Sequence, residues 1–83
     1  MRMIDLDRKQ AIKNVSIYLT PEEAQWMKRE LEDLLMDPEA IKHFHVHSLD
    51  NLGREISCSI ITKDKLKYLD RYNKLERSVL SEK

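Results

Sequence analysis

Hydrophobic and polar residues alternate cleanly at positions 15–19, with Val15, Ile17 and Leu19 on one side. Successive side chains of a strand point to opposite faces, so this pattern predicts a strand with one buried face. Residues 1–12 alternate only weakly, and they are either a short extra strand or a flexible lead-in.

A helix over residues 21–36 is predicted by signals at both of its ends. Thr20 suits the N-cap, Pro21 suits the first helical position, and Glu23 can complete a capping box. Asp37 precedes a proline, which disfavours helical backbone angles and ends the helix. Residues three and four apart predict the inward stripe, formed by Ala24, Met27, Leu31 and Leu34 with Trp26 and Leu35 at its edges. The acidic residues predicted to face solvent are Glu30, Glu32 and Asp33.

Two further strands, residues 43–48 and 54–62, flank a stretch that contains the only glycine, Gly53, and together they predict a hairpin. If both strands cover one core, their apolar side chains share a face, and opposite residues of an antiparallel pair lie on the same face. The predicted pairs are Phe44 with Cys58, Val46 with Ile56, His47 with Glu55, His45 with Ser57 and His43 with Ser59.

The stretch 38–52 also permits a helix that Gly53 would terminate. Its apolar residues near helical spacing are Ile41, Phe44, Leu49 and Leu52. A strand followed by two helices resembles the ribbon-helix-helix family, which would imply a DNA-binding dimer that uses the strand at 15–19. This interpretation competes with the hairpin.

From Lys63 onward, apolar residues recur three and four apart and predict one C-terminal helix. They are Leu66, Leu69, Tyr72, Leu75 and Val79. The elements predict an α+β fold of order β-α-β-β-α, with residues 1–83 as a single small domain. A three-stranded sheet would carry the first helix on its apolar face through a right-handed crossover, and the last helix would cover an end or a dimer seam.

The composition bounds the class of protein. With 41% hydrophobic and 36% charged residues, the chain can build only a thin core, which is often completed by self-association, so we expect a homodimer. Basic and acidic residues balance at 15 each, which argues against nucleic acid as the partner. One cysteine, the absence of a signal-like apolar core at the start and the lack of a membrane-length apolar run favour a cytoplasmic, bacterial-type setting with no membrane partner.

All three histidines lie in one predicted strand, at positions 43, 45 and 47, and share a face. Two histidines two residues apart can bind one zinc ion, at about 2.0 to 2.1 Å from each ring nitrogen. His43 and His47 lie roughly 13 Å apart along a strand, so a metal site would use His45 with one neighbour, and Glu55 is the nearest added ligand. The alternative is a solvated or dimer-buried row of imidazoles on the outer face of a one-sided sheet.

No complete catalytic set is visible, and we expect a non-enzymatic protein. Cys58 is predicted to face the core as an inert thiol, while Ser57 lies near the histidines without an oxyanion site or a recognisable third acid. One glycine excludes a glycine-rich phosphate loop, and one cysteine excludes a paired-cysteine zinc motif. Trp26, Tyr68 and Tyr72 either complete the core or anchor a protein partner.

Three short motifs resemble a group of small bacterial proteins, some of them grouped with immunity proteins of toxin systems. The motifs are Leu19-Thr20-Pro21-Glu22-Glu23-Ala24, His45-Val46-His47 and Arg54-Glu55-Ile56. The resemblance implies a compact non-enzymatic protein that binds a partner. We therefore expect a small cytoplasmic protein-interaction or regulatory module; a metal-binding module and a ribbon-helix-helix regulator are the alternatives.

Overall fold

A computed structural model describes residues 1–82. The chain forms two compact units. Residues 18–62 form the hairpin–helix unit, and residues 1–17 together with those from 63 onward form the terminal unit. No helix within residues 1–82 combines the length and the apolar character needed to cross a membrane.

Helix α1, Pro21–Leu35, begins where the sequence predicts. The Thr20 side-chain oxygen accepts a hydrogen bond from the Glu23 amide at 3.1 Å, and the Glu23 carboxylate accepts one from the Thr20 amide at 2.9 Å. The predicted capping box is therefore confirmed. The second oxygen of Glu23 accepts the Leu49 amide at 3.1 Å, which ties the start of α1 to the loop after β3.

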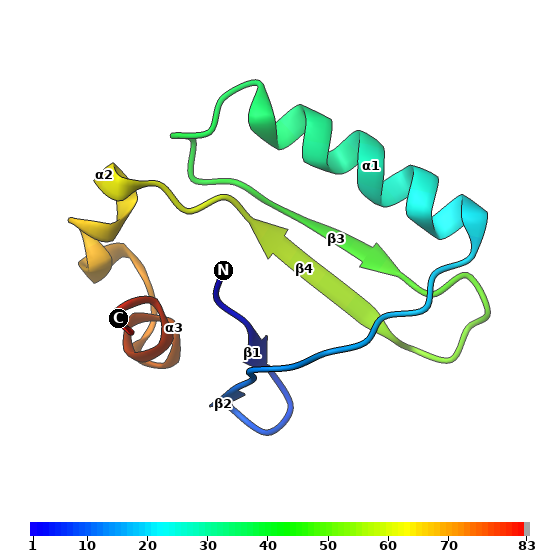
Figure 1. The fold of residues 1–83 in the computed structure, drawn as a ribbon, viewed down its shortest axis with the longest axis horizontal. Coiled ribbons are helices and arrows are strands. Elements are labelled where there is room, and N and C mark those ends of the chain that lie inside the picture. The colour runs from blue at the N-terminus through cyan, green and yellow to red at the C-terminus, as the bar shows by residue number, and fades with distance from the viewer. Residues whose placement is uncertain (83) are drawn as a thin grey trace. The chain divides into compact units, whose positions relative to one another are not determined.

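Strands β3, His43–His47, and β4, Glu55–Ser59, form the antiparallel hairpin (Figure 1). Every predicted pair is confirmed, from His43 opposite Ser59 to His47 opposite Glu55. Asn51 and Gly53 adopt positive φ angles of 61° and 74° in the connecting turn, a backbone conformation that favours glycine and tolerates asparagine. The helix interpretation of residues 38–52 is wrong, because the alternation of His43 to His47 lets Phe44 and Val46 bury together on one face.

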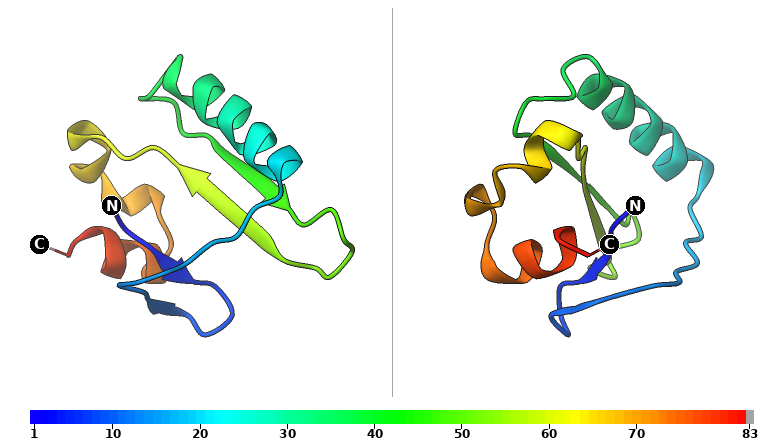
Figure 2. Two further views of the ribbon diagram at one scale, coloured as in Figure 1. Left: turned by 45° about the vertical axis from the view of Figure 1, so that its right-hand side comes forward. Right: turned by 60° about the vertical axis from the view of Figure 1, so that its left-hand side comes forward.

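The core of the hairpin–helix unit is small. Leu34 of α1 packs with Phe44 and Val46 of β3, and these three side chains are 8%, 4% and 3% exposed. Helix α1 lies beside β3, as the views in Figures 1 and 2 agree. Partly buried neighbours complete the cluster: Trp26, Met27, Cys58 and Ile60.

The predicted inward stripe of α1 is partly wrong. Ala24 and Leu31 are exposed, whereas Glu23 is buried and Glu30, predicted to face solvent, is half-buried. The reason is the bond between Glu23 and the Leu49 amide, which brings the Glu23 side of the helix toward the hairpin. Helical periodicity marks a stripe about 100° wide, and this contact selects which part of it faces the core.

The predicted three-stranded sheet is also wrong. Within residues 1–82 there are two separate two-stranded sheets, β3–β4 and the pair β1, Ile4–Asp5, with β2, Gln10–Ala11. Residues 15–19 have the side-chain pattern of a strand but join no ladder. A strand is defined by its hydrogen-bonded neighbour, which an alternating pattern does not supply.

The C-terminal stretch forms three short helices rather than the one predicted. These are α2, Lys63–Leu66, the 3₁₀-helix η1, Leu69–Arg71, and α3, Lys74–Leu80. Tyr68 leaves the helical region, with φ −127° and ψ 61°, and Asn73 forms a capping box with Glu76 that starts α3 anew. The asparagine side chain competes for backbone amides, which explains the break inside an otherwise helical pattern.

Candidate functional site

The outer face of the hairpin gathers the polar side chains that the sequence singles out. β3 contributes the three histidines, and β4 contributes Glu55, Ser57 and Ser59 opposite them. All six residues are exposed. The alternation that buries Phe44 and Val46 against α1 places this polar row on the other face.

His45 is the best-connected histidine of this row. Its Nδ1 lies 2.5 Å from a carboxylate oxygen of Glu55 and 2.9 Å from the hydroxyl oxygen of Ser57. A ring nitrogen this close to a carboxylate carries the proton and donates it, so the neutral imidazole keeps its lone pair on Nε2. A carboxylate that holds the other ring nitrogen is the usual support of a metal-binding histidine.

The remaining two histidines behave differently. The His43 ring lies 4.8 Å from the His45 ring, edge to face at 90°. The His47 ring instead lies 4.8 Å from the ring of Trp26, and its Nδ1 is 3.3 Å from the Ser48 carbonyl oxygen. The structure thus brings His43 and His45 together and turns His47 toward α1. Across the described part of the chain, no three or more His, Cys, Asp or Glu side chains are grouped as a metal site.

The contacts of His45 do not form a nucleophilic relay. Ser57 and Glu55 both approach Nδ1, whereas in a Ser-His-acid arrangement the nucleophile and the acid use different ring nitrogens. Cys58 lies on the opposite face, half-buried, and burial raises the pKa of its thiol. Neither side chain is therefore activated as a nucleophile.

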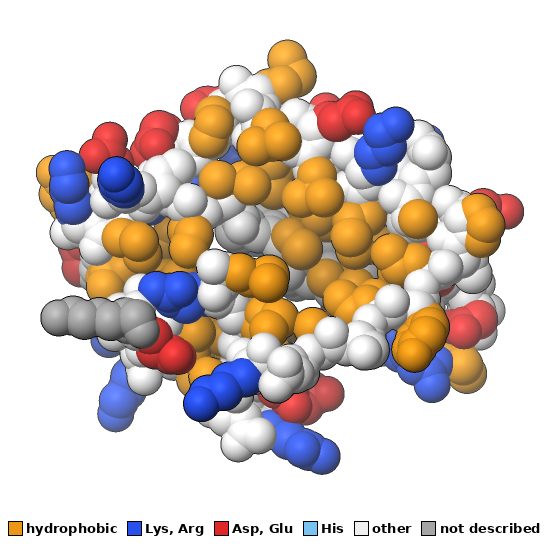
Figure 3. Space-filling model, in the orientation of Figure 1, with side chains coloured by type: hydrophobic (Ala, Val, Ile, Leu, Met, Phe, Trp, Pro, Cys, Tyr) orange, Lys and Arg blue, Asp and Glu red, His pale blue; other side chains and the backbone are white. Residues whose placement is uncertain are grey.

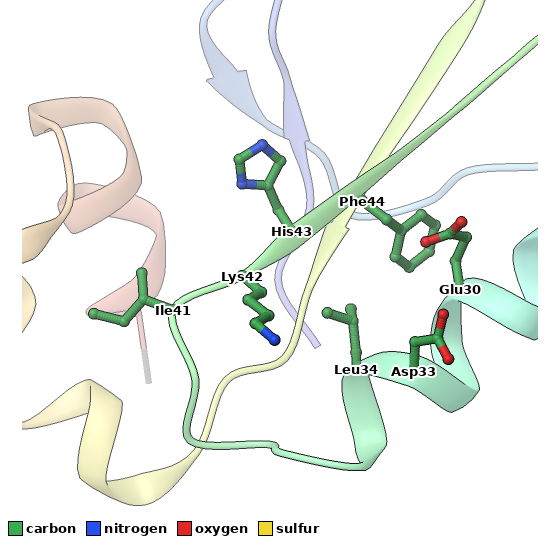
Figure 4. Close-up of a pocket in the computed structure, with 7 residues that line it drawn as sticks. All are labelled: Glu30, Asp33, Leu34, Ile41, Lys42, His43 and Phe44. Carbon is green, nitrogen blue, oxygen red and sulfur yellow. The ribbon is translucent and has the colours of Figure 1, made fainter.

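A shallow hollow of about 330 Å³ opens where α1 meets the start of β3 (Figure 4). Phe44 and Leu34 point toward one another on its apolar side, while the carboxylates of Glu30 and Asp33 lie beside Phe44. His43 also lines the hollow, although its ring leaves β3 on the side opposite Phe44.

The aromatic residues predicted to bind a partner belong to different compact units. Trp26 is half-buried in the hairpin–helix unit, against the core and His47. Tyr68 and Tyr72 belong to the terminal unit, where the Arg71 guanidinium lies 5.2 Å from the Tyr68 ring centroid and Arg77 donates to the Tyr72 carbonyl oxygen at 2.6 Å. These contacts leave Tyr68 exposed and Tyr72 half-buried.

The apolar face of the hairpin is covered unevenly. β3 is buried under α1, but the corresponding row on β4, Ile56, Cys58 and Ile60, is only half-buried. Figure 3 shows hydrophobic side chains gathered over the region of α1 and the hairpin. The alternating apolar pattern of this row predicted a core strand, and no pattern in the sequence indicated that one helix would cover only half of the sheet.

The outer edge of β4 has no strand partner in the hairpin–helix unit. The Ser48 amide donates to the Arg54 carbonyl at 2.8 Å, and hydrogen-bonded pairs alternate along an antiparallel ladder, so Ile56 and Cys58 direct their backbone groups toward β3. Glu55, Ser57 and Ser59 then direct theirs toward the outer edge. Within residues 1–82, β3 is the one strand that pairs with β4.

No family model, curated protein or solved structure matches the chain. The resemblance to immunity-type proteins therefore stays a prediction.

Proposed function

We propose that this protein is a non-enzymatic protein-binding module that receives an extended segment of a partner protein along the outer edge of β4. The observation that carries the proposal is the unpaired edge of β4 beside a half-covered apolar row. An added strand gains main-chain hydrogen bonds from the edge, and pockets for alternate side chains provide its specificity.

The edge also defines the chemistry of the partner segment. Its backbone would pair with Glu55, Ser57 and Ser59, and its apolar side chains, two residues apart, would extend the row of Ile56 and Cys58. Between them, polar side chains would lie beside Glu55, Ser57 and Ser59 on the outer face of β4. The preferred ligand is therefore an extended segment that alternates apolar and polar residues.

Selection from a displayed library of random eight-residue peptides tests this proposal on the full chain. We expect enrichment of alternating apolar sequences and, on titration, amide shift changes at Ser57 and Ser59 that exceed those at His43 and His45. The variants Ser57→Pro and Ser59→Pro remove outward N–H groups and spare the ladder to β3, so each should weaken peptide binding at least tenfold while circular dichroism stays unchanged. Absence of enriched peptides, or peptides that bind both variants as tightly as the parent, would refute edge binding.

A second candidate function, metal binding, is favoured by the contact between His45 Nδ1 and Glu55 and by the His43 ring, which lies 4.8 Å from the His45 ring. We propose that these two imidazoles bind a divalent transition metal, with Glu55 orienting His45 and water completing the shell. Zinc, nickel and copper titrations by calorimetry should show binding that His43→Ala and His45→Ala abolish and the matched variant His47→Ala preserves. Absence of heat with the parent protein, or equal loss in all three variants, would remove this candidate.

A further inference from the structure

The segment Val15–Leu19 has strand-forming residues without a strand partner. Val15, Ile17 and Leu19 are 52%, 51% and 37% exposed, and Tyr18 is 93% exposed. No charged residue occurs between Lys13 and Glu22. Exposed strand edges usually carry charges or prolines that prevent pairing with another chain, and this segment has neither before Pro21.

The pattern of the segment is complementary to itself. If two copies run antiparallel with Ile17 opposite Ile17, Val15 of each copy lies opposite Leu19 of the other, and all six apolar side chains share one face. Ser16 and Tyr18 then pair on the opposite face.

Other registers lose this match. A slip of one residue places apolar side chains opposite polar ones. A slip of two residues brings Lys13 opposite Leu19 in one direction, and in the other it brings Val15 opposite Pro21, which has no amide hydrogen to donate.

The adjoining helix cap fixes where the paired strand ends. The Thr20 amide donates to Glu23 and the Thr20 carbonyl oxygen accepts from Ala24, so Thr20 has already used its ladder groups. Residues 15–19 remain for pairing, and these are the five residues that the symmetric register uses. The chain carries no formal net charge, so long-range electrostatic repulsion does not oppose the approach of a second copy.

We propose that two copies of this chain associate through Val15–Leu19 as a two-fold antiparallel ribbon centred on Ile17. A two-fold contact uses the same surface on both chains, and the symmetric pattern of this segment supplies it. The proposal is independent of peptide binding at β4, because it uses a different segment.

Cysteine cross-linking tests the register. In a Cys58→Ala background, Ile17→Cys places two thiols on the two-fold axis, within the Cα separation of about 4.4 to 6.8 Å that a disulfide requires. Val15→Cys is the matched control, since Val15 and Ile17 have nearly equal exposure and the same face, yet the two Val15 positions lie roughly 13 Å apart in this register.

We expect mild oxidation to convert most of the Ile17→Cys protein to a covalent dimer and little of the Val15→Cys protein. The double variant Val15→Cys with Leu19→Cys should again cross-link. Equal cross-linking at Ile17 and Val15, or none at Ile17, would overturn the ribbon.

A measurement without introduced cysteines keeps the proposal testable if Cys58→Ala disturbs the fold. Sedimentation velocity should show a dimer of the parent chain that Ile17→Lys converts to monomer, with circular dichroism unchanged because Ile17 is exposed in the single chain. A parent chain that sediments as a monomer, or a dimer that survives Ile17→Lys, would refute the proposal.

Discussion

Leu31 and Leu34 provide a direct test of how α1 packs. Both are leucines of α1, three residues apart, and helical periodicity assigns both to the core. The structure distinguishes them, because Leu34 is 8% exposed and packs with Phe44 and Val46, whereas Leu31 is 36% exposed. Leucine and alanine differ only a little in helix propensity, so the difference between the two variants reports mainly burial.

The expected free-energy changes follow from this burial. Leucine-to-alanine changes in cores cost about 2 to 5 kcal/mol, and for Leu34 in a small core that can partly collapse we expect about 3 kcal/mol. For Leu31, which keeps a third of its surface in water, we expect about 1 kcal/mol. A difference of about 2 kcal/mol corresponds to roughly 8 to 16 °C in the melting temperature of a chain of this length.

Thermal and urea unfolding followed by circular dichroism would measure both variants against the parent protein. Equal midpoints for Leu31→Ala and Leu34→Ala, or a lower midpoint for Leu31→Ala, would mean that α1 presents the stripe expected from periodicity. The orientation set by Glu23 would then be wrong.

Three further outcomes are expected. The Thr20 and Leu49 amides lower the pKa of Glu23, so the stabilising contribution of its carboxylate is complete above the ordinary glutamate pKa of about 4.3 and is lost as the pH falls below it. The variant Glu23→Gln should therefore flatten the decline of melting temperature between neutral pH and pH 3. An unchanged decline would contradict a contribution from the Glu23 carboxylate. Asn73→Ala should destabilise the protein by about 1 kcal/mol through loss of the α3 cap, whereas in one continuous helix alanine would be stabilising. The sign of the change in unfolding free energy, measured in urea, therefore distinguishes a capped α3 from one continuous C-terminal helix. Burial raises the pKa of the Cys58 thiol, so its reaction with an aromatic disulfide at pH 8 should be severalfold slower in the folded protein than in urea, and equal rates would contradict its placement.

The sequence predicted local features well. The capping box at Thr20 and Glu23 is confirmed, because it depends only on residues three positions apart. The complete register of the hairpin is also confirmed, because the alternation of apolar and polar residues determines which residues share a face. The same alternation correctly placed the histidines opposite Ser57, Ser59 and Glu55.

Features that depend on distant partners were less predictable. The pattern at 15–19 is that of a strand, yet whether it pairs depends on a neighbour elsewhere in the chain or in another copy. The orientation of α1 depends on the Leu49 amide, and the contact of His47 with Trp26 depends on that orientation. Spacing alone could not indicate that His47 would separate from the other two histidines.

The Glu23 carboxylate also has a consequence for folding kinetics. One of its oxygens accepts an amide three residues earlier, and the other accepts an amide 26 residues later. A nascent α1 could form its local cap early, but the second bond forms only when the end of β3 arrives. The local cap can therefore precede docking of the hairpin, and docking then adds a long-range hydrogen bond to the same carboxylate.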